Sequence, residues 1–131
     1  KALECNQRKT RENPVADLMA ESMLWISRTK RPQANAQIAL INSGEIKSDI
    51  SQGDVTTKQI KDAFPFTQNV TIVETKFTKK QLFEALNWGV KTTTFPKMTL
   101  GLLQVGGLRY TVGSDNMVKD VYLLNEDGSL V

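Results

Sequence analysis

The sequence predicts an α+β fold, a layered α/β domain in which helices flank a mixed sheet. Two observations predict it. Three segments open with helix-start signals and continue with helical spacing of apolar residues. Between and after them lie short segments that are β-branched, or that alternate between apolar and polar residues, as strands do. The predicted order is helix, strand, helix, strand, helix and two further strands.

The first helix is predicted over residues 14–28. Asn13 is a favourable N-cap, and Pro14 fits the first helical turn because its fixed φ suits the helix and its missing N–H is not needed there. Trp25 and Leu24 widen the apolar stripe, which predicts a well-buried helix. The stripe itself consists of Val15, Leu18, Met19, Met23 and Ile26.

Two further helices are predicted from capping boxes at residues 56–59 and 78–81. In each, a Thr can cap the helix start and a Gln three residues later can cap the Thr in return. The first of these helices must end just before Pro65, because a proline disfavours helical geometry in the residue that precedes it. Gly89 is expected to end the second.

Strands are predicted at residues 38–41, 70–73, 102–112 and 118–124. The first is a short apolar run that stops at a turn, and the second is β-branched. The third alternates but is interrupted at 106–107 by two glycines. That pair indicates a bulge, or a backbone that another group must approach closely.

Length, charge and composition restrict the possible functions. The 131 residues suffice for one domain, spanning 1–131, and no apolar run is long enough to cross a bilayer. The net charge of +3 comes mainly from the first 31 residues, which suits a phosphate partner or a solvated helix face. The chain has no histidine and one cysteine. Serine triads, Cys–His dyads and histidine-bound zinc are therefore excluded in their usual forms.

Two segments carry the side chains most suited to binding. Residues 42–47, Asn-Ser-Gly-Glu-Ile-Lys, follow a strand end, where backbone N–H groups and an Asn amide can meet an oxyanion that Lys47 neutralises. The alternative is an ordinary turn. Phe66 follows Pro65 on a stiffened segment and can stack on a nucleobase, worth roughly 1–3 kcal/mol per base, or can belong to the core. Carboxylates in helix and turn positions could act in acid–base chemistry, but surface or capping roles are favoured and no metal site is predicted; these are Asp17, Glu21, Asp49 and Asp54.

These motifs, taken in order, resemble the C-terminal domain of 5′-nucleotidases, a family that includes periplasmic UDP-sugar hydrolases and cell-surface ecto-5′-nucleotidases. Residues 11–18 resemble the family's opening Arg-Glu and Gly-Asn-Leu helix start, and 42–47 resemble its Asn-Gly-Gly-x-Ile-Arg loop. Residues 53–56 resemble its Gly-x-Ile-Thr turn and 65–66 its Pro-Phe. Residues 103–108 resemble its Leu-Gln-Val-Ser/Gly-Gly stretch.

The resemblance implies a nucleotide- or nucleoside-binding domain that is not catalytic alone. Hydrolysis would belong to an N-terminal metallophosphoesterase domain carrying two divalent metal ions. Asn42 would hydrogen-bond the nucleoside, Phe66 would stack on the base, and Lys47 would approach the phosphate. The resemblance also implies a periplasmic, secreted or cell-surface location and no nucleic-acid polymer as partner. The implied site residues are Asn42, Gly44, Lys47, Phe66, Lys9 and Arg11.

Two departures from the family pattern bear on these expectations. Lys47 and Lys9 stand where the family has phosphate-binding arginines, which keeps the charge but loses the bidentate fork. The chain also stops at Val131, before the family's Gly-Gly-Asp segment and second stacking aromatic. We therefore expect a domain truncated at its C-terminus and separated from its metallophosphoesterase domain. The alternative is a non-catalytic binding or protein-interaction module that retains the fold.

Overall fold

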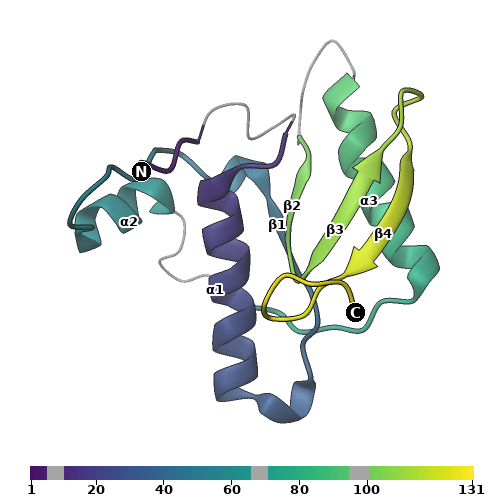
Figure 1. The fold of residues 1–131 in the computed structure, drawn as a ribbon, viewed down its shortest axis with the longest axis horizontal. Helices are drawn as coiled ribbons and strands as arrows, with labels where there is room; N and C mark the ends of the chain where they lie inside the picture. The colour runs from purple at the N-terminus through teal and green to yellow at the C-terminus, as the bar shows by residue number, and fades with distance from the viewer. Residues whose placement is uncertain (6–10, 66–70, 95–100) are drawn as a thin grey trace.

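The computed structural model describes residues 1–5, 11–65, 71–94 and 101–131 (Figure 1). None of the helices within these ranges is both long and apolar enough to cross a membrane. Two single-turn 3₁₀ helices, η1 and η2, flank the first strand. The elements are α1 Pro14–Lys30, η1 Pro32–Ala34, β1 Ala39–Asn42, η2 Ser43–Glu45, α2 Thr57–Ala63, α3 Lys79–Thr94, β2 Leu103–Gly106, β3 Leu108–Val112 and β4 Val118–Leu123.

The strands form two antiparallel pairs that share one continuous path of chain. β1 pairs with β2, with Ile41 opposite Gln104, and β3 pairs with β4. β2 runs into β3 through Gly107 alone, so one bent strand pairs first with β1 and then with β4. The predicted α+β class is confirmed. Both described strand pairs are antiparallel, so the expected mixture of parallel and antiparallel strands is not seen among the described residues. For β3 and β4 the short turn between them permits only this pairing.

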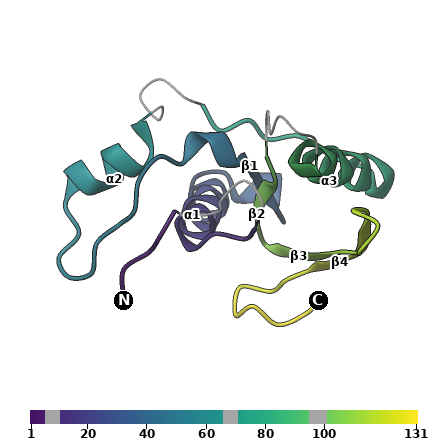
Figure 2. The same cartoon turned by 90° about the horizontal axis from the view of Figure 1, so that it is seen from above.

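Helices pack on both faces of the β1–β2 pair. Ala39 and Ile41 pack with Ala20 and Leu24 of α1. Leu40 points the other way and packs against the core cluster of α3, as the alternation of side chains along a strand requires. Figure 2 shows β1 and β2 between the two helices. The predicted arrangement of a sheet flanked by helices is therefore confirmed.

Helix α1 begins as the sequence predicts but is less buried than expected. The Asn13 side chain accepts hydrogen bonds from the N–H groups of Val15 and Ala16, at 3.1 and 3.3 Å. Leu24 is buried, whereas Trp25 is 66% exposed. Successive helical residues point about 100° apart, so Trp25 turns away from the sheet that its neighbour contacts. The predicted burial of Trp25 was wrong.

Both predicted capping boxes are present, but α3 does not stop at Gly89. The N–H of Thr78 donates to Gln81 Oε1 at 2.9 Å, and the N–H of Gln81 donates to Thr78 Oγ1 at 3.2 Å. The helix continues to Thr94. Gly89 lies inside the helix, at its contact with β2. A Cβ at Gly89 would lie 3.1 Å from the backbone nitrogen of Leu103, so the missing side chain lets α3 approach β2.

The predicted strand at 70–73 is wrong for its described part, residues 71–73, which pair with no strand. Val73 is 80% exposed. A β-branched residue favours a strand when it packs against neighbouring strands, and this segment has none among the described residues. Side-chain contacts hold this segment instead. Glu74 accepts a hydrogen bond from Ser27 Oγ at 2.6 Å and forms an ion pair with Arg31 at 3.1 Å, which attaches it to the end of α1.

The glycine pair at 106–107 marks a close approach, as the sequence predicts. Gly107 has φ +68°, and a Cβ there would collide with the carbonyl oxygen of Gln37 and with Leu24. A Cβ at Gly106 would lie 3.0 Å from the backbone of Ala20. The two glycines therefore let the bent strand pass directly against α1 and the segment that leads into β1.

Candidate functional site

One buried apolar cluster brings together three of the segments that the sequence marked for binding. It consists of Val15, Ala16, Ile46, Ile50, Ala63 and Phe64. These residues come from the start of α1, the loop after β1 and the end of α2. Ile46 immediately precedes Lys47, and Phe64 immediately precedes Pro65. The N–H of Lys47 also donates to the carbonyl of Ala63 at 2.9 Å. Because Ile46 and Phe64 are buried in one cluster, the loop after β1 and the end of α2 lie side by side.

The loop after β1 is organised by its own asparagine. Asn42 Oδ1 accepts a hydrogen bond from the N–H of Gly44 at 3.1 Å and thereby caps η2. A Cβ at Gly44 would lie 3.3 Å from Asn42 Nδ2. This spacing is tighter than ordinary van der Waals contact, so glycine at this position leaves the Asn42 amide where it is. The asparagine and the glycine of the motif therefore depend on each other.

The backbone of this loop offers less to an anion than the sequence suggested. The N–H groups of Gly44, Ile46 and Lys47 donate to Asn42, Ser43 and Ala63 respectively. The expected cradle of free backbone N–H groups is therefore absent at these three positions. What the loop presents is side-chain chemistry, namely the Nδ2 donor of the half-buried Asn42 and the ammonium of the exposed Lys47.

Arg11 lies at the same end of the sheet, and a residue that sequence reasoning overlooked holds it there. The buried Gln104 donates from Nε2 to the carbonyl of Arg11 at 2.7 Å and accepts from the N–H of Asn13 at 3.1 Å. Gln104 faces Ile41, the residue before Asn42. The Leu-Gln-Val motif was the available signal, but it did not reveal the contact. Lys9 and Phe66 lie outside the described residues.

Several acidic side chains lie near the start of α1, and two of them have shifted pKa values. Burial first, and the neighbouring carboxylates of Glu12 and Glu21 second, together raise the pKa of Asp17 to about 6. Asp49, by contrast, has a lowered pKa because its carboxylate accepts a hydrogen bond from the N–H of Cys5 at 2.6 Å. Asp49 thus has a structural role. In the described ranges, no group of three or more His, Cys, Asp or Glu side chains could hold a metal ion.

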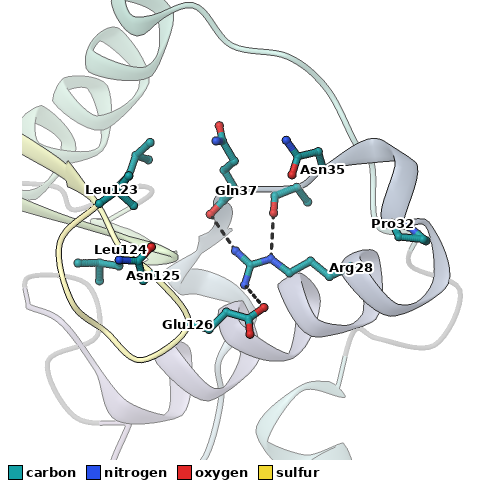
Figure 3. Close-up of a pocket in the computed structure, with 10 residues that line it drawn as sticks. Arg28, Pro32, Asn35, Gln37, Leu123, Leu124, Asn125 and Glu126 are labelled. Atoms are coloured by element: carbon teal, nitrogen blue, oxygen red, sulfur yellow. Dashed lines mark hydrogen bonds and ion pairs between the residues drawn. The ribbon is translucent and has the colours of Figure 1, made fainter.

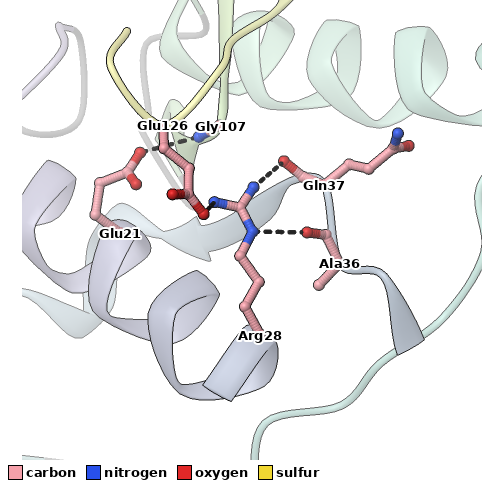
Figure 4. A network of polar contacts seen from close by, with 6 residues as sticks. All are labelled: Glu21, Arg28, Ala36, Gln37, Gly107 and Glu126. Carbon is pink, nitrogen blue, oxygen red and sulfur yellow. Dashed lines mark hydrogen bonds and ion pairs between the residues drawn. The ribbon is translucent and has the colours of Figure 1, made fainter. Parts of the chain in front are cut away.

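A cavity of about 460 Å³ lies elsewhere, beside Arg28 and the segment after β4 (Figure 3). Its one cation is already engaged. Arg28 donates from Nε to the carbonyl of Ala36 at 3.0 Å and from a terminal nitrogen to the carbonyl of Gln37 at 3.5 Å. It also forms an ion pair with Glu126 at 3.4 Å (Figure 4). Arg28 therefore connects α1 with the segment before β1 and with the segment after β4. Because its guanidinium is already bound in these contacts, it is unsuited to an anionic ligand.

A larger groove, of about 1010 Å³, runs between the second half of α1, residues 33–40 and residues 72–79. The exposed Ile72, Val73 and Phe77 stand along it. Among the described site residues that the sequence predicted, none lines this groove or the cavity beside Arg28. Of these, Arg11 and Lys47 are exposed.

Comparisons with known proteins identify the family of the chain. The sequence profile of a family described as 5′-nucleotidase, C-terminal domain, matches residues 1–129. The chain is 29% identical over 113 residues to the trifunctional nucleotide phosphoesterase protein YfkN of Bacillus subtilis (strain 168). It is also similar to a crystal structure of a 5′-nucleotidase precursor from Thermus thermophilus, with a TM-score of 0.74 and 26% identity.

The similarity covers nearly all of this chain but a small part of each relative. The match to the Bacillus protein covers 82% of this chain and 7% of that protein. The match to the Thermus structure covers 99% of this chain and 25% of that chain. Activities named for the whole relatives therefore belong to proteins much longer than the matched region.

Proposed function

The chain belongs to the 5′-nucleotidase C-terminal domain family, and from this premise we propose that it binds the nucleotide or nucleoside for a metal-dependent phosphohydrolase. One observation carries the proposal. The loop of residues 42–47, the end of α2 and the start of α1 share a single core cluster. Side chains of complementary chemistry, an amide and two cations, are thereby gathered at one end of the sheet.

Each side chain has a distinct part in the proposed site. The Nδ2 group of Asn42 donates to the nucleoside, because its Oδ1 is already occupied by Gly44. The cations of Lys47 and Arg11 attract the phosphate, and both side chains are exposed. Phe66 supplies the ring that stacks on the base, and Lys9 adds a further positive charge. These last two roles rest on the sequence motifs alone.

Hydrolysis is assigned in this proposal to an N-terminal metallophosphoesterase domain. Residues 1–131 then form a single binding domain that presents the substrate to the metal ions of that partner domain. The described residues of this chain form no cluster suited to a metal ion, and no step of the proposal needs one here. A periplasmic, secreted or cell-surface location belongs to the same proposal.

A second candidate is a protein-interaction module that keeps the fold without binding substrate. Two observations favour it. Lys47 and Lys9 replace arginines of the family pattern, which weakens geometric selection of phosphate. Trp25 and Ile26 are also exposed on one side of α1, where apolar side chains suit a protein partner.

Titration of the chain with AMP, adenosine and a UDP-sugar by calorimetry separates the two candidates. We expect AMP to bind, Phe66→Ala to weaken adenosine and AMP alike, and Lys47→Ala to weaken AMP only. Lys61→Ala is the matched control, because Lys61 is an exposed lysine on α2 outside the proposed site. Absence of binding by all three ligands would overturn the substrate-binding proposal and favour the interaction module.

A further inference from the structure

We propose that Gln104 is a positioning residue that fixes Arg11 for contact with the phosphate of the bound nucleotide. The inference rests on the proposed function. It concerns a side chain that is itself 2% exposed and therefore does not touch the ligand. Gln104 acts through the backbone on either side of Glu12, which it holds at two points.

Two hydrogen bonds to residues 11 and 13 need both halves of the Gln104 amide. Nε2 donates to the carbonyl of Arg11 at 2.7 Å, and Oε1 accepts from the N–H of Asn13 at 3.1 Å. A carboxylate could accept but not donate, and an apolar side chain could do neither. Glutamine at this position therefore fixes the backbone of residues 11–13 in one place.

Gln104 also links residues 11–13 to the loop of residues 42–47. Gln104 lies opposite Ile41 in the β1–β2 ladder, and Leu103 lies opposite Asn42. The strand that holds Arg11 is thus the strand that pairs with the residues leading into the 42–47 loop. Gln104 thereby sets where Arg11 stands relative to Asn42.

Arg11 depends on this support because little else holds it. Its side chain is exposed and makes no hydrogen bond or ion pair with any described residue. Asn13, in contrast, is anchored independently, since its side chain caps α1 and donates to the carbonyl of Glu4 at 2.8 Å. Loss of the Gln104 amide should therefore loosen Arg11 while α1 keeps its cap.

A double-mutant cycle tests the inference on the 131-residue chain. The variants are Gln104→Met, Arg11→Ala and the two together, each titrated with AMP and with adenosine. We expect Gln104→Met to weaken AMP about tenfold, the change that about 1.4 kcal/mol produces, and to change adenosine affinity less than about twofold. In the Arg11→Ala background, Gln104→Met should have no further effect on AMP.

Other outcomes overturn the inference separately from the proposed function. Equal losses for AMP and adenosine would show a general structural role, and losses that multiply in the double variant would show that Gln104 does not act through Arg11. If Gln104→Met does not fold, Gln104→Glu replaces it in the same cycle, because it keeps the acceptor for Asn13 and loses the donor to Arg11, while the charge that it adds is present in both backgrounds of the cycle. Failure of the wild-type chain to bind either ligand would instead reject the proposed function, and this inference with it.

Discussion

The carboxylate of Glu21 accepts a hydrogen bond from the backbone N–H of Gly107 at 3.0 Å (Figure 4). This bond attaches α1 to the single residue through which β2 becomes β3. Arg28 stands seven residues later on α1, about two helical turns away and therefore on the same side. It holds the carbonyls of Ala36 and Gln37. Glu21 and Arg28 of α1 thus bind the bend between β2 and β3 and the segment that leads into β1, respectively.

Removal of the Glu21 acceptor should destabilise the bend. In Glu21→Ala the N–H of Gly107 is left without its partner in a buried backbone, and we expect the free energy of unfolding to fall by about 1–3 kcal/mol. Glu21→Gln keeps an oxygen acceptor and should lose less than half of that amount. Urea denaturation measures both. Equal losses in the two variants would show that the charge of Glu21, not its acceptor, stabilises the fold.

Gly107 itself should tolerate no side chain. Gly107→Ala adds a Cβ that meets the Gln37 carbonyl and Leu24 at a residue with φ +68°, and we expect a loss of about 3 kcal/mol or more. Gly128→Ala is the matched control, because Gly128 has φ +81° and open space around it. Backbone strain alone should make the control cost about 1–2 kcal/mol. Thermal denaturation of both variants isolates the contribution of the close approach.

The elements that the sequence predicted correctly are those whose signals are local. Asn13 caps α1 and Thr56 caps α2 through bonds to the next few residues, so their spacing in the sequence suffices. Gly89 shows the opposite case, because its close approach to Leu103 is a tertiary contact that the sequence did not indicate. For Gly107 the sequence left a bulge and a close approach open, and the contact with Gln37 decides between them.

The candidate site divides in the same way. The 42–47 loop could be proposed as a site from the sequence because its asparagine, glycine and lysine lie within six residues. The sequence did not show that the backbone N–H groups of this loop already donate hydrogen bonds. The acceptor for the N–H of Lys47, for example, is the carbonyl of Ala63 on α2. The role of Gln104 was equally hidden, because its partner Arg11 is 93 positions away in the sequence.

The contacts of Arg28 should matter more through the two carbonyls than through the ion pair. Glu126 has a side chain that is 84% exposed, so Glu126→Gln should cost less than about 0.5 kcal/mol. Arg28→Met keeps much of the aliphatic packing but leaves the carbonyls of Ala36 and Gln37 without their donor, which should cost about 1–2 kcal/mol. Chemical denaturation of the two variants gives the comparison. A larger loss for Glu126→Gln would contradict it.

Ionised Asp17 should oppose folding at neutral pH. Its folded pKa is raised from 3.8 to about 6, mainly by burial, although an acidic residue in the first turn of a helix is normally favourable. Because the folded state holds the proton more tightly, the destabilisation is fully present above pH 6. It declines as the pH falls through 6 and is gone below 3.8.

Asp17→Asn should therefore stabilise the chain at about pH 7.5, by about 1 kcal/mol once solvent screening of this half-buried carboxyl is taken into account. At about pH 3.5 the same substitution should change stability little, because Asp17 is then mostly protonated in both the folded and the unfolded chain. Melting temperatures of the two proteins across this pH range measure the difference. A gain of equal size at both pH values would point to altered packing, since an effect of ionisation must disappear once the carboxyl is neutral.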